Sequence, residues 1–148
     1  MSEENVEIVR QVVELFRNLD LKSEGAAVGE GDVAAAIEFF HPDFELDATR
    51  APMPDLRGKF TGLTEPAAFW SKWLEAWDSI EFEDELTDAG EGIVLAAITP
   101  MAMRGKGSGI AVEFPRHWHV FTLREGQVIR QTLFLDESEA LEAAGLSE

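Results

Sequence analysis

Two histidines near the C-terminal end of the chain have the types and spacing that acid-base chemistry needs. His117 and His119 are separated by one residue, which puts both side chains on one face of a β-strand. The turn at 124–126 suits a three-residue hairpin loop that places His119 opposite Gln131. An imidazole near neutral pKa in an apolar pocket is a suitable general acid or base, so His119 is the candidate catalytic residue. The alternative is a buried neutral imidazole, hydrogen-bonded to Gln131 or to a backbone carbonyl.

Strand parity decides which side chains share a face with the two histidines. In the predicted register, His117, Gln131, Phe121 and Leu133 lie on that face, and we expect them to line a ligand pocket. The opposite face carries Trp118, Val120, Thr122, Val128, Arg130, Thr132 and Phe134. We expect this second face to be the outer one, because arginine and threonine side chains are easily left partly exposed. A register error of one residue would invert the assignment.

A helix rich in tryptophan is predicted to cover the pocket. Thr64 is a suitable N-cap for it, and Pro66 is tolerated in its first turn. Its apolar stripe consists of Phe69, Trp70, Trp73, Leu74 and Trp77. Trp70 and Trp73 are therefore candidate ligand-binding residues beside the histidines. The tryptophans are equally explained as core residues.

The polar residues allow two further interpretations. Asp47 alternates with buried positions of a predicted strand and faces outward unless the strand is bulged, so it is a candidate binding residue only in a bulged strand. The His117-x-His119 spacing also suits two metal ligands, but Glu125 falls in the predicted turn and no third ligand is evident. We expect no metal and no cofactor.

The elements that must position these residues divide into helices followed by hairpin-linked strands. That order predicts an α+β domain with an antiparallel sheet. A loop is predicted from Lys22 to Gly31. The expected helices are Glu3–Leu19, Val33–Phe40, the helix capped by Thr64 and Asp136–Ala144. The expected strands are Phe44–Ala48, Ile80–Leu86, Ile93–Met103, Ile110–Leu123 and Val128–Leu135.

Composition restricts the class of protein. The 148 residues suit a single domain spanning 1–148. A formal net charge of −17 disfavours nucleic acid and anionic membrane surfaces as partners. Cysteine is absent, which excludes disulfides and thiolate chemistry. The start of the chain has no basic segment leading into an apolar one, so we expect a cytoplasmic protein without a membrane span.

Several separated motifs carry a family likeness across nearly the whole chain. They are Glu4–Arg10, Gly31-Asp32, His41-Pro42-Asp43-Phe44, Ala76-Trp77, Gly107-Ser108-Gly109, His119–Gly126 and Phe134–Leu146. Together they resemble the SnoaL-like branch of the nuclear transport factor 2-like superfamily, also called ketosteroid isomerase-like or cystatin-like. The resemblance implies a cone, in which a curved antiparallel sheet wraps around three N-terminal helices and a short C-terminal helix follows. It also implies a pocket in the concavity, and often a dimer across the outer face of the sheet.

The fold implied by this resemblance hosts many chemistries, so the function must come from the site. We expect a protein that binds an apolar, cyclic metabolite and acts as a cofactor-free isomerase, dehydratase or cyclase using His119. The alternative is a non-catalytic ligand-binding or dimerisation module. In either case we expect a homodimer through Trp118, Val120 and Phe134 on the outer face.

Overall fold

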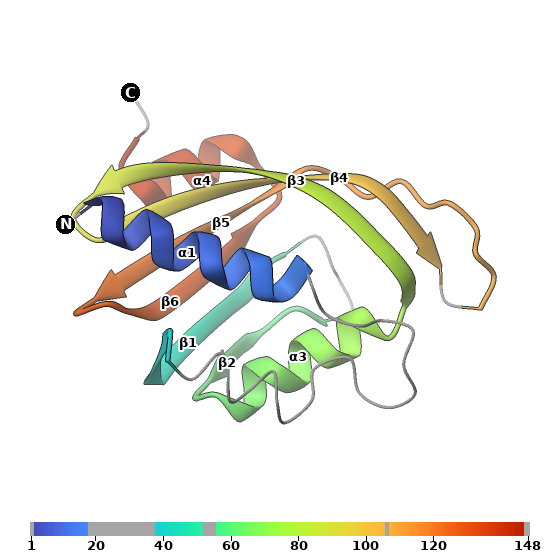
Figure 1. The fold of residues 1–148 in the computed structure, drawn as a ribbon, viewed down its shortest axis with the longest axis horizontal. Helices are drawn as coiled ribbons and strands as arrows, with labels where there is room; N and C mark the ends of the chain where they lie inside the picture. The colour runs from blue at the N-terminus through green and yellow to red at the C-terminus, as the bar shows by residue number, and fades with distance from the viewer. Residues whose placement is uncertain (1, 18–37, 52–55, 106, 147–148) are drawn as a thin grey trace.

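A computed structural model describes residues 2–17, 38–51, 56–105 and 107–146, which form three helices and one six-stranded sheet (Figure 1). The described chain is therefore α+β, as predicted. None of its helices is long and apolar enough to cross a membrane. The elements are α1 (Ser2–Arg17), β1 (Phe40–Arg50), β2 (Lys59–Thr61), α3 (Thr64–Leu74), β3 (Trp77–Gly90), β4 (Ile93–Gly105), β5 (His117–Arg124), β6 (Gln127–Phe134) and α4 (Glu137–Ala144).

The first and last helices agree with their sequence signals. In α1, Val9 and Val13 recur at helical spacing and are buried against the sheet, while acidic residues occupy the first turn. In α4, the Asp136 carboxylate accepts a hydrogen bond from the Glu139 backbone N–H at 3.0 Å. Gly145 ends α4 in the left-handed conformation at φ 77°. The predicted helix Asp136–Ala144 is thus confirmed, with Asp136 as its N-cap.

Other helix predictions were wrong or lie outside the described residues. Phe40 was expected to end a helix but begins β1, and the rest of that expected helix up to position 37 lies outside the described residues, as does the expected loop Lys22–Gly31. Thr64 is the first helical residue of α3 and not its cap, because the preceding Leu63 already has helical backbone angles. The helices are therefore not all N-terminal: among the described residues one is N-terminal, one central and one C-terminal.

The sheet is mixed and not purely antiparallel. Its strand order is β2-β1-β6-β5-β4-β3, and β1 runs parallel to β6 while the other neighbours are antiparallel. Antiparallel pairing was predicted from hairpins, but a long stretch of chain separates β1 from β6, so no tight turn determines their relative direction. The short strand β2, which pairs with β1 through Leu46 and Phe60, was not predicted.

The predicted strand Ile110–Leu123 is shorter than expected, since β5 begins only at His117. Pro115 has no backbone N–H and cannot continue a ladder. The chain before it folds back on the end of β4, where the Val112 N–H donates to the Met103 carbonyl at 2.9 Å. Phe114 therefore lies in an irregular segment between β4 and β5.

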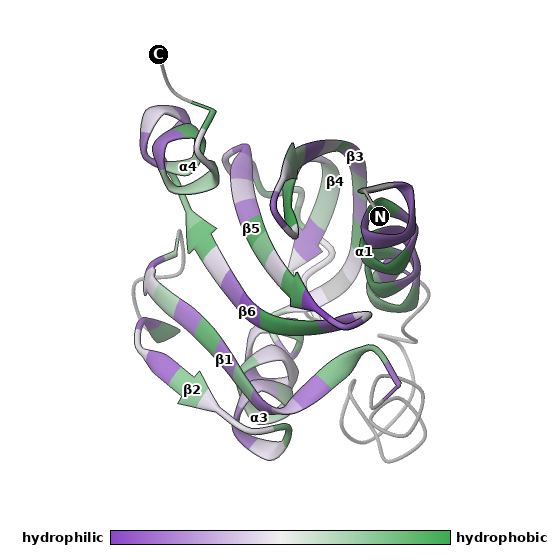
Figure 2. Ribbon diagram, turned by 90° about the vertical axis from the view of Figure 1, so that its left-hand side faces the viewer, coloured by the Kyte–Doolittle hydropathy of each residue, from purple (hydrophilic) through white to green (hydrophobic). Residues whose placement is uncertain are grey.

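The sheet separates two apolar layers. The larger layer lies on the side of α1 and α3 and includes Val9, Leu46, Phe69 and Phe121. The smaller layer lies under α4. β3 and β4 are the longest strands and bend over α1 (Figure 1), and α4 lies across the sheet from α1 (Figure 2). One face of the curved sheet therefore looks toward α1 and α3, and we call it the inner face.

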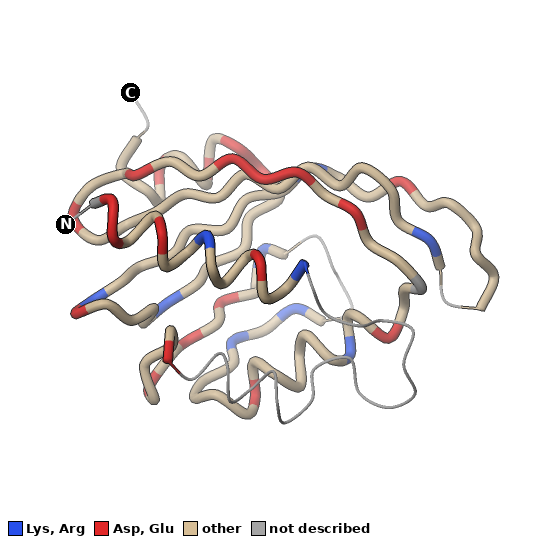
Figure 3. The backbone as a smooth tube through the Cα atoms, in the orientation of Figure 1, with Lys and Arg blue, Asp and Glu red and all other residues tan. Residues whose placement is uncertain are grey.

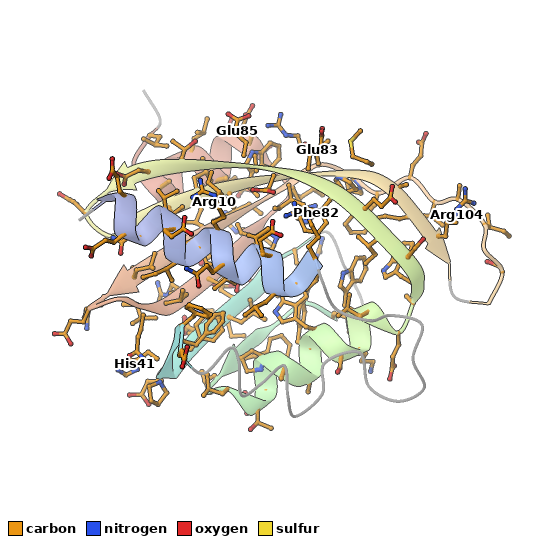
Figure 4. The ribbon with its side chains drawn as sticks, viewed as in Figure 1. Arg10, His41, Phe82, Glu83, Glu85 and Arg104 are labelled. Atoms are coloured by element: carbon orange, nitrogen blue, oxygen red, sulfur yellow. The ribbon has the colours of Figure 1, made fainter. Side chains whose placement is uncertain are left out.

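The edge strand β3 carries several acidic residues (Figure 3), of which Glu81, Glu83 and Glu85 are exposed. Glu83 and Glu85 project from one side of β3, whereas Phe82 lies on the α1 side (Figure 4). On that inner side Arg17, at the end of α1, pairs with the Asp84 carboxylate at 2.5 Å and lies over the Phe82 ring. Charges at an exposed edge discourage pairing with another strand.

Candidate functional site

His117 and His119 both lie on the inner face of β5. Successive residues of a strand point to opposite faces, and Phe121 and Leu123 of the same parity belong to the apolar layer beneath α1 and α3. Trp118 and Val120 belong instead to the layer under α4. Only 9% of each histidine is exposed. The predicted parity of β5 is thus confirmed, and the two imidazole centroids lie 5.3 Å apart.

The register between β5 and β6 differs from the prediction by two residues. The loop contains two residues, Glu125 and Gly126, both at positive φ, so that Arg124 pairs with Gln127. A bulge where the pairing passes from Leu123 to Thr122 shifts the register by one further residue, and His119 lies opposite Leu133, not opposite Gln131. Because the two shifts add up to two residues, the β6 side chains from Arg130 onward lie on their predicted faces. Between the loop and the bulge the register differs by one residue, and Val128 faces the inner layer, contrary to the prediction.

Each histidine is fixed by a hydrogen bond to its Nδ1 atom. Nδ1 of His119 lies 2.7 Å from Nε2 of Gln131, which is itself buried. An amide nitrogen only donates, so Nδ1 of His119 accepts and its proton resides on Nε2. Nδ1 of His117 lies 3.0 Å from the Pro115 carbonyl oxygen. A carbonyl only accepts, so His117 has its proton on Nδ1 and a free lone pair on Nε2.

Both imidazoles are neutral because of their surroundings. Burial lowers the pKa of His117 below 6.5, and the hydrogen bond to Pro115 opposes that effect only in part. Burial lowers the pKa of His119 further, well below 6.5, and the neighbouring His117 contributes in the same direction. At neutral pH the pair therefore offers one N–H donor and one nitrogen lone pair without a net charge.

Aromatic rings enclose the His119 imidazole. Trp70 of α3 lies nearly parallel to it at 6.1 Å between centroids with an interplanar angle of 11°, and Phe121 does so at 6.0 Å and 14°. Trp70 also meets Phe69 and Phe16 edge to face. The prediction that Trp70 and Phe121 lie beside His119 is thus confirmed. Such surroundings suit an apolar ring compound.

A second group of rings extends from His117. Phe114 packs edge to face on His117 at 5.6 Å and contacts Trp73 at 4.9 Å. Phe114 therefore connects Trp73 to His117. The sequence did not indicate this role, because Phe114 was predicted to lie in a strand. Trp77 begins β3 and does not belong to the helix, although it still contacts Trp73 at 5.3 Å. Its buried indole N–H has no hydrogen-bond partner among the residues that the structure describes.

The remaining predicted site residues are divided between the two faces. Leu133 is fully buried in the inner layer, opposite His119. Asp47 lies between Leu46 and Ala48, whose side chains are in the inner layer, so it points the other way. Its carboxylate accepts hydrogen bonds from the backbone N–H and the hydroxyl of Thr49. The structure does not bring Asp47 to the histidines.

The residues around the pair provide no further metal ligand. In the parts of the chain that the structure describes, no group of three His, Cys, Asp or Glu side chains could hold a metal ion. The pair alone offers two nitrogen ligands, fewer than the three protein ligands of a typical catalytic zinc site. Neutral imidazoles can exchange protons and donate hydrogen bonds.

The outer face differs from the expected subunit contact. Trp118, Val120 and Phe134 are each less than a tenth exposed and pack with Ala140 and Ala144 of α4. The sequence predicted α4 but gave no signal for where it packs. Helix α4 therefore covers the surface that was expected to meet a second subunit.

Comparison with known proteins places this arrangement among related folds. A family model described as a SnoaL-like domain matches residues 25–131. TerC, crystallised with polyporic acid, has a TM-score of 0.67 and 17% identity over 96% of this chain and 98% of that chain. An NTF2-like protein of unknown function from Burkholderia pseudomallei K96243 has a TM-score of 0.67 and 20% identity, covering 94% and 95%. A candidate SnoaL-like polyketide cyclase from Jannaschia sp. CCS1 has a TM-score of 0.60 and 23% identity, covering 99% and 94%. No curated protein is significantly similar to the chain.

Proposed function

Because the chain belongs to the SnoaL-like family of the nuclear transport factor 2-like superfamily, we propose that its inner face binds a small molecule. The ligand class is an uncharged, apolar, ring-containing metabolite. The reaction class is an isomerisation, dehydration or cyclisation without a cofactor, with His119 as the catalytic residue. Ligand binding is the broader part of this proposal, and catalysis is the narrower part.

One observation carries the proposal: the buried polar groups of the inner layer are concentrated in one place. Among the buried residues described, the polar side chains are His117, His119 and Gln131, and all three lie on β5 and β6. The rings that contact the histidines belong to Trp70, Phe121 and Phe114. Convergent polar groups among aromatic side chains are typical of small-molecule sites.

The related structures support the binding of a small organic molecule. TerC was crystallised with polyporic acid, and the Jannaschia protein is described as a candidate polyketide cyclase. Both descriptions concern small organic molecules. Their identities to this chain are below 25%, so they support the fold and the general class of ligand, and the residues of this chain must define the chemistry.

A binding experiment with matched variants tests the site. β-Tetralone, an uncharged bicyclic ketone, is titrated into the protein by calorimetry. Trp70→Phe should weaken its binding about threefold to tenfold, because an aromatic contact contributes about 0.5–1.5 kcal/mol. Trp118→Phe, the same change on the outer face, should alter the affinity by less than about twofold. Equal effects of the two substitutions would show that the ligand does not bind on the inner face.

A second experiment tests the role of His119 in catalysis. His119→Gln keeps a polar side chain of moderate size beside Gln131. We expect it to abolish proton exchange or turnover of β-tetralone while its free energy of unfolding, measured in urea, changes by only about 1–2 kcal/mol. A loss of folding stability with unchanged ligand behaviour would remove the support for catalysis.

A further inference from the structure

We propose that the two histidines divide the proton-transfer work, with His117 as the proton acceptor and His119 as the hydrogen-bond donor. This inference rests on the proposed function and assigns roles within the same site. It changes the sequence-based assignment, in which His119 alone transfers the proton. The roles follow from the hydrogen bonds that Gln131 and Pro115 make to the ring nitrogens of His119 and His117.

His119 cannot accept a proton on Nδ1 without losing a buried hydrogen bond. That nitrogen is occupied by the amide of Gln131 at 2.7 Å, and Gln131 is 5% exposed. The remaining ring nitrogen, Nε2, carries the proton and can only donate. Trp70 and Phe121 lie nearly parallel to the imidazole, at 6.1 Å and 6.0 Å between ring centroids, and restrict its orientation. Gln131 is therefore a positioning residue for His119.

His117 is the complementary partner. Its Nδ1–H donates to the Pro115 carbonyl at 3.0 Å, which leaves the Nε2 lone pair free to accept a proton. The backbone hydrogen bond would also hold the ring after protonation, because Nδ1–H donates in both charge states. Pro115 thus orients His117 as Gln131 orients His119. The Pro115 carbonyl accepts a hydrogen bond from its histidine, whereas the Gln131 amide donates one.

This pair fits a carbonyl compound with a hydrogen on the carbon next to the carbonyl. The C–H bond breaks, its proton passes to Nε2 of His117, and its electron pair forms a C=C bond. The carbonyl π pair moves onto oxygen, which accepts a hydrogen bond from Nε2–H of His119. Where a C=C bond adjoins that carbon, the enolate is a dienolate. Return of the proton from His117 to the far carbon of this dienolate shifts the C=C bond and completes an isomerisation without any other reactant.

The contacts of the pair favour an uncharged substrate. Trp70, Phe121, Phe114 and the amide of Gln131 contact the two rings, and none of these side chains is ionised. An isolated charge in such surroundings is strongly disfavoured. The charges that form during the reaction arise together, as imidazolium and enolate, and attract each other.

NMR of protein labelled with heavy nitrogen in histidine tests the assignment directly. We expect His117 to show a protonated Nδ1 and a bare Nε2, and His119 to show the reverse. Gln131→Glu, which replaces the amide donor with a carboxylate acceptor, should protonate Nδ1 of His119 and leave the His117 pattern unchanged. The same tautomer on both rings of the wild-type protein would overturn the inference while leaving ligand binding intact.

Proton exchange supplies the functional half of the test. In deuterium oxide, the wild-type protein should accelerate exchange at the carbons beside the β-tetralone carbonyl. His117→Gln should slow this exchange about a hundredfold or more while binding changes less than about threefold, because general base catalysis contributes about two to four orders of magnitude. Exchange that survives in His117→Gln would refute the assignment. Failure of β-tetralone to bind the wild type would instead refute the proposed function.

Discussion

Acidification should destabilise the fold through the buried histidines, and His119→Gln should remove much of this effect. In the folded protein, the pKa of His119 lies well below the ordinary value of 6.5, so folding excludes the proton that the unfolded chain binds. Protonation therefore favours unfolding. The stabilising contribution of the neutral imidazole is complete above pH 6.5 and is lost as the pH falls toward the lowered pKa.

The size of the effect follows from linkage. Where a histidine is neutral in the folded protein but protonated in the unfolded chain, each pH unit of acidification lowers the free energy of unfolding by up to about 1.4 kcal/mol. Between about pH 7.5 and about pH 5 this sums to at most about 2 kcal/mol for His119. His117, whose pKa is lowered less, contributes in the same direction by a smaller amount. About 2 kcal/mol is a large share of the stability of a small domain.

Urea unfolding followed by tryptophan fluorescence at the two pH values measures this loss. The wild type should lose more stability on acidification than His119→Gln, by up to about 2 kcal/mol, because both proteins share all carboxylates and differ in one buried imidazole. His41→Gln is the matched control, since the side chain of His41 is 40% exposed, and it should lose as much as the wild type. An equal loss in wild type and His119→Gln would refute the reasoning.

Three further substitutions test the fold. Gly92→Ala should destabilise the protein by about 2–3 kcal/mol, because an added Cβ would lie 2.6 Å from the Leu123 carbonyl oxygen in addition to the strain at φ 80°. Gly126→Ala has the same φ with no atom within 4 Å, and should cost only about 1 kcal/mol in the same urea titration. Asp136→Ala removes the N-cap of α4 and should cost about 1 kcal/mol, with a lower melting temperature by calorimetry; no change there would contradict the capping role.

Strand parity was predictable from the sequence, whereas strand pairing was not. The one-residue spacing of His117 and His119 determines that they share a face in any strand. Their partners depend on the loop length and on a bulge near Leu123, and neither has a distinctive sequence signal. Each error shifted the register by one residue, so together they preserved the parity. Gln131 still reaches His119, because diagonal neighbours in a sheet lie within reach of a long side chain.

The aromatic surroundings were predictable only where the secondary structure was correct. Trp70 lies in the middle of α3, and its contact with His119 followed from helical spacing. Phe114 and Trp77 were assigned to the wrong elements, because apolar residues at element boundaries fit a strand and a helix equally well. Their contacts depend on the irregular segment before His117, whose path is decided by tertiary packing.

Helix α4 buries the apolar outer side of the central strands within the same chain. A chain truncated after Asp136 would expose the indole of Trp118 together with Val120 and Phe134. These side chains form an apolar surface that extends across β5 and β6. Such a truncated protein would be prone to aggregate. Its aggregation would result from the loss of α4, which covers these side chains, and not from a defect in the core around the histidines. Fusions and tags at this end must therefore leave Glu137–Ala144 free to dock.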